Sequence, residues 1–214
     1  GDCHRQGTWP AHRPVSSSAA RAKRLPGVSP SAQTLGGGAS SVVIPTSDPN
    51  CVLRPWREGD QEALVRHANN RRVWRNLTHT FPHPYTLADA EHWLSIANAD
   101  PRSVHLAIEL QGQAIGGVGA IAGTGISVAT ADFGYWLGES FWGRGLATTA
   151  ASAFKEHLVQ SKRFARLQAP VFAWNPASMR VLEKGGFLRE GVLRNSVTKD
   201  GELIDSVMYA YTAA

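Results

Sequence analysis

The chain alternates between short apolar segments typical of strands and segments whose apolar residues recur every three to four positions, as in helices. The strand-like segments are residues 52–56, 104–110, 114–121, 133–137, 166–172, 192–199 and 203–211. The helix-like segments are residues 60–70, 86–97, 147–158 and 176–184, and residues 71–85 predict a loop or a broken helix. Turn sequences at Gln111–Gln113 and Asp200–Gly201 predict hairpins. We therefore expect an α/β fold, with a mixed, mostly antiparallel sheet of about seven strands and helices on both faces.

The first 47 residues have a different composition from the rest of the chain. They are rich in Ser, Ala, Gly and Pro, show no sustained periodicity, and contain five Lys or Arg against one acid. This composition predicts a disordered basic tail and linker over residues 1–47, followed by one folded domain over residues 48–214. Of the net charge of +5, only +1 remains for that domain, so we expect no nucleic-acid partner.

The few cysteines and the absence of long apolar runs bear on location. The chain has two cysteines, Cys3 and Cys51, and no apolar run near the ~20 residues of a membrane span. We therefore expect a cytoplasmic protein without a membrane partner. An acid-poor, Arg- and Ser-rich start is also typical of transit peptides, but the prolines at positions 10, 14, 26 and 30 interrupt the amphipathic helix that such peptides form.

Residues 131–147 carry the clearest chemical signal. The aromatic strand segment Phe133–Leu137 ends at Gly138, and a short turn leads through Trp142–Ala147 into the helix-like segment. Glycines allow a ligand to approach the main chain, and the free N–H groups at a helix start bind phosphate groups. The segment is not a P-loop, because no Gly-Lys-Ser/Thr follows, and many α/β proteins use such a connection without binding anything.

A second segment makes the first more specific. Val171–Phe187 contains Asn-Pro-Ala-Ser followed by Leu-Glu-Lys-Gly-Gly-Phe. Together with Trp-Gly-Arg-Gly-Leu-Ala after the aromatic strand, it resembles the GNAT N-acetyltransferases. Leu53–Trp56 and Arg189–Gly191 resemble the RimJ/RimL-like branch, which acetylates the N-terminal amine of ribosomal proteins. The resemblance covers roughly residues 50 to 212.

The resemblance implies a binding site for acetyl-CoA that uses mainly main-chain atoms. It places the pyrophosphate on the turn and the pantetheine arm along the end of the strand, like an added strand. The implied residues are Trp136, Leu137, Gly138, Trp142, Gly143, Arg144, Gly145, Leu146, Ala147, Asn175 and Ser178. The chain departs from the family at Trp142, where Gln or Arg is usual; because the implied contact is main-chain, we expect binding to survive.

The resemblance also makes Ser178 the candidate catalytic residue, since it places this serine near the sulfur of the cofactor. Many family members carry a general-acid tyrosine on this helix, but the corresponding position here is Leu182, so no phenol is expected there. The resemblance instead implies that Ser178, or a water it holds, assists the leaving thiolate. Asn175 has a structural interpretation as well, because Asn before Pro is a common helix N-cap.

The general base is left open by the sequence. Asp132, near the start of the aromatic strand, is the first candidate, and His105 and Glu109 on the preceding strand are alternatives. A glutamate used by some relatives corresponds to Val197 here, so that role does not transfer. We expect no metal, because His79 and His83 lack a third ligand.

The resemblance implies direct acetyl transfer from acetyl-CoA to a primary amine in a ternary complex. The acceptor is either a protein N-terminus or a small molecule, such as a polyamine, an amino acid or an antibiotic. The alternative is a non-catalytic module that binds CoA or serves as a scaffold. His79, His83, Tyr85 and Trp74 fall in the loop region that covers the acceptor site in relatives, so the resemblance makes them candidate acceptor-pocket residues. Trp56, Trp93 and Trp174 are expected in the core. We expect a monomer or a homodimer.

Overall fold

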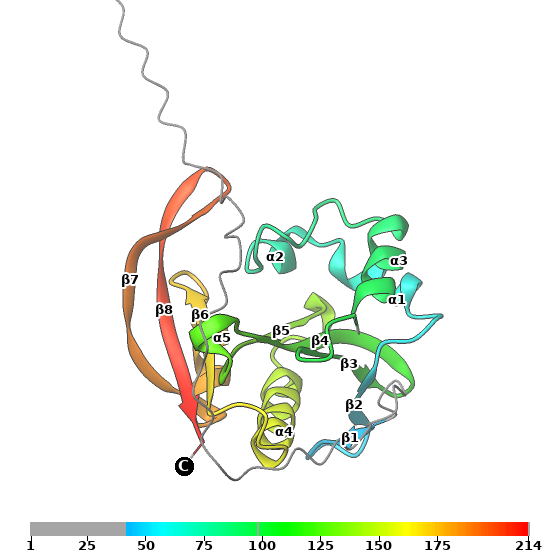
Figure 1. Cartoon of the computed structure of the whole chain (residues 1–214). Helices are drawn as coiled ribbons and strands as arrows, with labels where there is room; N and C mark the ends of the chain where they lie inside the picture. The colour runs from blue at the N-terminus through cyan, green and yellow to red at the C-terminus, as the bar shows by residue number, and fades with distance from the viewer. Residues whose placement is uncertain (1–41, 98, 214) are drawn as a thin grey trace, which may run out of the picture. The chain divides into compact units, whose positions relative to one another are not determined.

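A computed structural model describes residues 42–97 and 99–213, which form a sheet with helices on both faces (Figure 1). The strands are β1 (Ile44–Pro45), β2 (Cys51–Pro55), β3 (Val104–Leu110), β4 (Gln113–Ala122), β5 (Thr130–Leu137), β6 (Arg166–Phe172), β7 (Leu188–Lys199) and β8 (Glu202–Thr212). The α-helices are α1 (Gln61–Ala68), α2 (Arg71–Trp74), α3 (Leu87–Ile96), α4 (Leu146–Gln160) and α5 (Pro176–Lys184), and short 3-10 turns cover Gly125–Ser127 and Glu139–Phe141. The predicted α/β class is confirmed. None of the described helices has the length and apolar character needed to cross a membrane.

The sheet has eight strands in the order β1-β2-β3-β4-β5-β6-β8-β7. All neighbours are antiparallel except β5 and β6, so the expected mostly antiparallel, mixed sheet is confirmed. The strand beyond the expected seven is β1, whose Ile44 pairs with Leu53 although it falls inside the predicted tail. The sheet therefore begins before residue 48. Residues 1–41 of the predicted tail lie outside the described residues.

Two apolar layers sit on opposite faces of the sheet. The helix α4 presents Ala150, Phe154 and Leu158 to one face, because these residues recur at helical spacing on one side. The helices α1 and α3 cover the other face, where Leu64 and Ala90 pack in the second core cluster. Figure 1 shows α4 on one side of the sheet and α1 and α3 on the other. The expectation of helices on both faces is confirmed.

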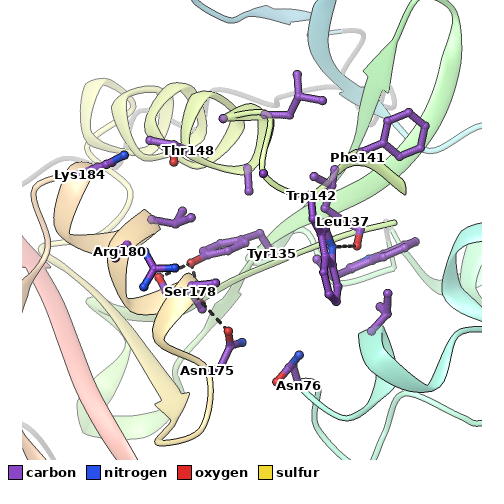
Figure 2. Close-up of a pocket in the computed structure, with 18 of the residues that line it drawn as sticks. Asn76, Tyr135, Leu137, Phe141, Trp142, Thr148, Asn175, Ser178, Arg180 and Lys184 are labelled. Carbon is purple, nitrogen blue, oxygen red and sulfur yellow. Dashed lines mark hydrogen bonds between the residues drawn. The ribbon is translucent and has the colours of Figure 1, made fainter. Parts of the chain in front are cut away.

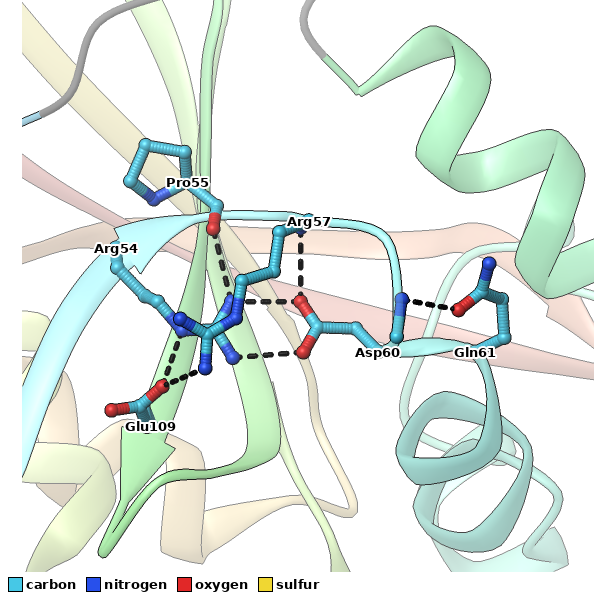
Figure 3. A network of polar contacts seen from close by, with 7 residues as sticks. Arg54, Pro55, Arg57, Asp60, Gln61 and Glu109 are labelled. Atoms are coloured by element: carbon cyan, nitrogen blue, oxygen red, sulfur yellow. Dashed lines mark hydrogen bonds and ion pairs between the residues drawn. The ribbon is translucent and has the colours of Figure 1, made fainter.

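A buried ion network fixes the first helix to the sheet (Figure 3). The guanidinium of Arg54 on β2 makes two hydrogen bonds to the carboxylate of Asp60, at 2.7 and 2.8 Å, and a third to Glu109 on β3. Asp60 precedes α1, so one side chain links two strands and a helix start. Burial alone would lower the pKa of Arg54, but the hydrogen bonds and charges of Asp60 and Glu109 outweigh this effect and raise the pKa.

The parallel strands β5 and β6 pair over only three residues. Their register runs from Thr130 opposite Arg166 to Asp132 opposite Gln168, and then the strands part. The remainder of β5, Phe133–Leu137, still pairs with β4 on its other edge. One edge of this segment therefore has no strand partner within the described residues, and unpaired main-chain groups there are available to a ligand.

Candidate active site

A cavity of about 410 Å³ lies where β5 and β6 part (Figure 2). Its walls come from β5, from the turn that leads into α4 with the first residues of that helix, from α5, and from α2 with the residues after it. The lining residues are Val73, Asn76, Leu77, Tyr135, Trp136, Leu137, Phe141, Trp142, Gly143, Gly145, Leu146, Ala147, Thr148, Asn175, Ala177, Ser178, Arg180, Val181 and Lys184. The volume falls within the ~300–1,000 Å³ typical of small-molecule sites.

The turn before α4 has the geometry of an anion site. Gly143 and Gly145 have φ angles of +74° and +80°, which other residues adopt only with strain. Apart from each glycine and its two chain neighbours, no atom of the described residues lies within 4 Å of the position that a Cβ would take at Gly143 or Gly145. Gly145 is the N-cap of α4 and makes no side-chain capping hydrogen bond. The first N–H groups of α4 are therefore open to a ligand at the positive end of the helix dipole.

Two cations on α5 face the same cavity. Arg180 and Lys184 are four residues apart, so their side chains lie on one face of the helix, and both line the cavity (Figure 2). Neither belongs to the ion pairs of the described chain. The sequence interpretation missed them, because charged residues at this spacing are common on any exposed helix. Their position beside an uncapped helix start suits a ligand with several negative charges.

The start of α5 carries the two polar residues that the sequence indicated. The side chain of Asn175 accepts a hydrogen bond from the main-chain N–H of Ser178 at 3.2 Å, so the N-cap interpretation of Asn175 is confirmed. Both side chains also line the cavity. Leu182 is buried in the core, and the helix therefore directs this position away from the ligand space.

A phenol nevertheless lies beside Ser178, which the sequence interpretation missed. The hydroxyl of Tyr135 on β5 donates to the main-chain carbonyl of Ser178 at 2.9 Å and lies 2.8 Å from its Oγ (Figure 2). Burial raises the pKa of Tyr135 well above its usual value. The sequence interpretation expected no phenol on α5, where Leu182 occupies the usual position, and it did not anticipate one from the neighbouring strand. The tyrosine comes from the strand instead of the helix.

Trp142 takes a structural role at the position where it departs from the family pattern. Its indole Nε1 donates to the main-chain carbonyl of Leu137 at 2.7 Å. The guanidinium of Arg72 lies over its ring, 5.6 Å from the centroid, and also pairs with Glu139. The indole therefore ties the turn to the end of β5, while its ring forms part of the cavity wall.

Two of the predicted cofactor residues do not line the cavity. The main-chain N–H of Gly138 donates to Ile115 on β4, at 2.8 Å, so Gly138 faces the sheet. The guanidinium of Arg144 lies over the ring of Phe141, 5.7 Å from its centroid. The other predicted cofactor residues, Trp136, Leu137, Trp142, Gly143, Gly145, Leu146, Ala147, Asn175 and Ser178, all line it.

Comparison with known proteins identifies the family. The sequence profile of the GNAT acetyltransferase domain matches residues 50–188. The chain belongs to the GNAT acetyltransferase family. The turn from β5 into α4 and the start of α5, which together form the cavity, both lie within the matched GNAT region.

Curated GNAT relatives match part of the chain. The ribosomal-protein-serine acetyltransferase of Escherichia coli (strain K12) is 35% identical over 81 residues, which cover 38% of this chain and 45% of that protein. The uncharacterized N-acetyltransferase p20 of Bacillus licheniformis is 34% identical over 80 residues, 37% of this chain and 45% of that protein. The chain thus spans less than half the length of the curated relatives it matches, 41–45%.

Solved GNAT structures share the fold over most of the chain. RimJ of Mycobacterium smegmatis, solved in complex with CoA-disulfide, is 27% identical with a TM-score of 0.71. The similarity covers 80% of this chain and 87% of that one. This match supports the RimJ/RimL-like branch that the sequence motifs indicated.

None of the three candidate bases lines the GNAT cavity. The carboxylate of Asp132 is exposed and accepts a hydrogen bond from Gln168 at 2.8 Å. Glu109 is bound to Arg54 and Arg57 in the buried network. His105 packs edge-on against Trp93, 5.1 Å between ring centroids, and burial lowers its pKa. Within the described residues, the structure brings none of these groups to Ser178.

The aromatic residues expected near the acceptor site, Trp74 and Tyr85, do not line this cavity. Trp74 stacks on His83 with ring centroids 5.4 Å apart, and Tyr85 is buried in the second core cluster. Neither His79 nor His83 lines the cavity. In the part of the chain that the structure describes, no group of three metal-ligating side chains is present.

Two of the three tryptophans expected in the core pack there. Trp56 is buried and Trp93 packs against the same cluster. Trp174 instead lies outside both core clusters, where the guanidinium of Arg75 covers its ring at 4.2 Å from the centroid. Its indole also packs edge-on against Phe172 at the end of β6, with ring centroids 6.1 Å apart, so it joins the β6–α5 turn to the end of α2.

Proposed function

We propose that this protein transfers an acetyl group from acetyl-CoA to a primary amine, either a protein N-terminal α-amine or the amine of a small molecule. One observation carries the proposal: the unpaired edge of β5 and the uncapped start of α4 open into the same cavity. An acyl-CoA needs both, since its arm can pair with a strand edge and its pyrophosphate suits a helix N-terminus. The CoA complex of Mycobacterium smegmatis RimJ supports this assignment.

The residues present fit acetyl-CoA in more detail. The main-chain N–H of Gly123, the residue after β4, donates a hydrogen bond to the main-chain carbonyl of Thr130. Because main-chain groups alternate in direction along a strand, the even-numbered residues of β5 direct theirs toward β4. Odd-numbered residues therefore face the gap between β5 and β6. Of these, Leu137 already has its carbonyl bound by Trp142. The main chain of Tyr135 is then free to pair with the pantetheine amides. The glycine turn, Arg180 and Lys184 would hold the phosphates.

The chemistry follows from this placement. The acceptor nitrogen attacks the thioester carbon, the C–S bond breaks, CoA leaves as a thiolate, and the nitrogen loses a proton to solvent. Ser178, on the cavity wall, would stabilise the leaving sulfur by a hydrogen bond. No acetyl-enzyme is expected at Cys51, because this residue is buried in the core, where burial raises the pKa of its thiol.

The preferred acceptor follows from the missing base. Because neither Asp132, Glu109 nor His105 lines the cavity, the amine must arrive already neutral. An α-amine has a pKa of about 8, whereas a lysine side chain has a pKa of about 10.4. We therefore expect α-amines to react faster than lysine side chains. The value of kcat/KM should rise with pH through the pKa of the amine itself.

Thiol release from acetyl-CoA tests this proposal. The assay uses a panel of short peptides with free or blocked N-termini, a lysine side-chain amine and polyamines, from about pH 6.5 to about pH 9.5. Release that depends on a free α-amine and rises with pH is expected. Faster reaction of internal lysines would overturn the acceptor preference. Tight binding of acetyl-CoA without release for any amine would favour the non-catalytic alternative.

The ribosomal-protein acetyltransferase among the relatives supports a cytoplasmic location.

A further inference from the structure

The hydrogens of the Tyr135 and Ser178 hydroxyls can be counted from their contacts. The Tyr135 hydroxyl donates its one hydrogen to the Ser178 carbonyl, at 2.9 Å. The 2.8 Å contact between the two hydroxyl oxygens must then use the hydrogen of Ser178. Both hydroxyl hydrogens are thus consumed inside the pair. In this arrangement the Ser178 oxygen presents only its lone pairs to the cavity.

That arrangement is the wrong one for stabilising a leaving thiolate. A thiolate needs a hydrogen-bond donor, and Ser178 can donate to the cavity only if its hydrogen is released from Tyr135. Rotation of the phenol hydrogen away from the Ser178 carbonyl and onto Ser178 Oγ achieves this without moving a heavy atom. The carbonyl loses little, because Ser178 lies in α5 and its carbonyl keeps a helical partner.

We propose that Tyr135 is a positioning residue that reverses the hydrogen-bond direction of Ser178 when acetyl-CoA is bound. The inference rests on the proposed function. With acetyl-CoA in place, Tyr135 donates to Ser178 Oγ, and the Ser178 hydrogen points to the sulfur of the leaving CoA. After the thiolate has left, the Tyr135 hydrogen turns back to the Ser178 carbonyl and the Ser178 hydrogen turns back to the Tyr135 oxygen. Both O–H bonds stay intact in this step and only hydrogen bonds are exchanged, so no further acid or base is required.

The surroundings of Tyr135 support this role. Its hydroxyl spans the gap between β5 and the first turn of α5, at the place where the strands have parted. Burial raises the pKa of Tyr135, so the phenol stays protonated and acts as a donor throughout the neutral range. Phe133, two residues earlier on the same face of β5, packs instead in the core, which leaves Tyr135 as the residue of this strand that reaches Ser178.

A double-mutant cycle with Tyr135→Phe and Ser178→Ala tests the inference by thiol release with the best amine. Each single variant should lower kcat roughly tenfold and change the KM for acetyl-CoA by less than about twofold. Because Tyr135 acts through Ser178, the double variant should be no slower than Ser178→Ala alone. Tyr211→Phe, outside the cavity, is the matched control and should match the wild type.

The outcomes separate the inference from the proposed function. If the wild type releases no thiol with any amine, the proposed function fails. If it turns over but Tyr135→Phe is as fast, or if the two losses multiply in the double variant, the inference fails. Should Tyr135→Phe not fold, calorimetry compares CoA with desulfo-CoA on the wild type and Ser178→Ala. At a pH above the thiol pKa of about 8.5, the wild type should bind CoA more tightly than desulfo-CoA, and Ser178→Ala should not. The same preference for CoA in both proteins would overturn the inference.

Discussion

At the scale of single residues, the cavity wall that the described residues form combines hydroxyl, amide and cationic groups and contains no carboxylate. Ser178, Tyr135 and Asn175 meet at one end, and Arg180 and Lys184 lie along the same helix. Such a set can bind a polyanion and stabilise a leaving anion. It cannot take a proton from an amine near neutral pH, because the cations are already protonated and the hydroxyls are weak bases.

Asp132→Asn should therefore have little effect on turnover. The carboxylate is exposed, bonded to Gln168, and outside the cavity. We expect kcat/KM to fall by less than about threefold, well under the 10²–10⁴-fold of a general base. Steady-state kinetics across pH measures the effect. Loss of the activity, or of its dependence on pH, would restore Asp132 as the base.

His67 should make stability depend on pH. Its Nε2 is buried without a hydrogen-bond partner among the described residues, and its ring packs edge-on against Phe141, 5.2 Å between centroids. Burial, and next the charge of Arg66, lower its pKa. Below the unfolded pKa of about 6.5, the unfolded chain binds a proton that the folded chain does not. The contribution of neutral His67 to folding stability is therefore fully present above the unfolded pKa. It is lost as the pH falls below that value and through the lower folded pKa.

Melting temperatures at about pH 7.5 and about pH 5.5 measure this dependence. His67→Leu cannot take up the proton, so its melting temperature should fall less between the two values than that of the wild type. His79→Leu, which changes an exposed loop histidine, is the matched control and should behave like the wild type. An unchanged pH dependence in His67→Leu would show that His67 is not the group responsible.

Local rules predicted some of the site residues and failed for others. Asn175 before Pro176 predicts a helix cap from sequence alone, and the glycines of the turn indicate a backbone that approaches a ligand. The contact between Tyr135 and Ser178 joins residues 43 positions apart, on a strand and a helix. To predict this contact, one must know how far β5 lies from α5 in the folded domain, and no local sequence pattern gives that distance.

At the scale of elements, the Arg54 network determines how α1 meets the sheet. Arg54→Met should lower the free energy of unfolding by about 3 kcal/mol, because Asp60 would lose its cationic partner in a buried place and Glu109 would keep only the exposed Arg57. Denaturant unfolding measures the change. Arg57→Met is the control, since this exposed side chain pairs only with Glu109, and it should cost less than about 1 kcal/mol. Equal losses would contradict the role given to Arg54.

The element boundaries show where sequence periodicity is informative. The central strands and the helices α4 and α5 appear close to their predicted ranges, because each presents a continuous apolar face to the core. The strand β1 was missed, since two residues carry no periodicity. The strand β7 begins four residues earlier than predicted, at Leu188. It is an exposed edge strand with irregular register after Arg189, which disrupts the two-residue repeat.

At the scale of the whole domain, the cavity joins the two layers. The turn before α4 belongs to the α4 face, and Glu139 in this turn accepts a hydrogen bond from Asn70, the N-cap of α2, at 2.7 Å. Val73 and Leu77, on and after α2, complete the wall opposite α5. The proposed donor site is therefore built from the sheet and both helical layers.

Calorimetric titration with acetyl-CoA tests the central claim, that this cavity is the donor site. The wild type should bind, and Gly145→Glu should bind at least roughly tenfold more weakly, because a carboxylate would occupy the place of the pyrophosphate. Gly191→Glu, at an open position on β7, should bind like the wild type. Melting temperatures check that each variant is folded, since Gly145→Glu adds about 1–2 kcal/mol of backbone strain. Unchanged affinity in a folded Gly145→Glu protein, or no binding by the wild type, would contradict the account.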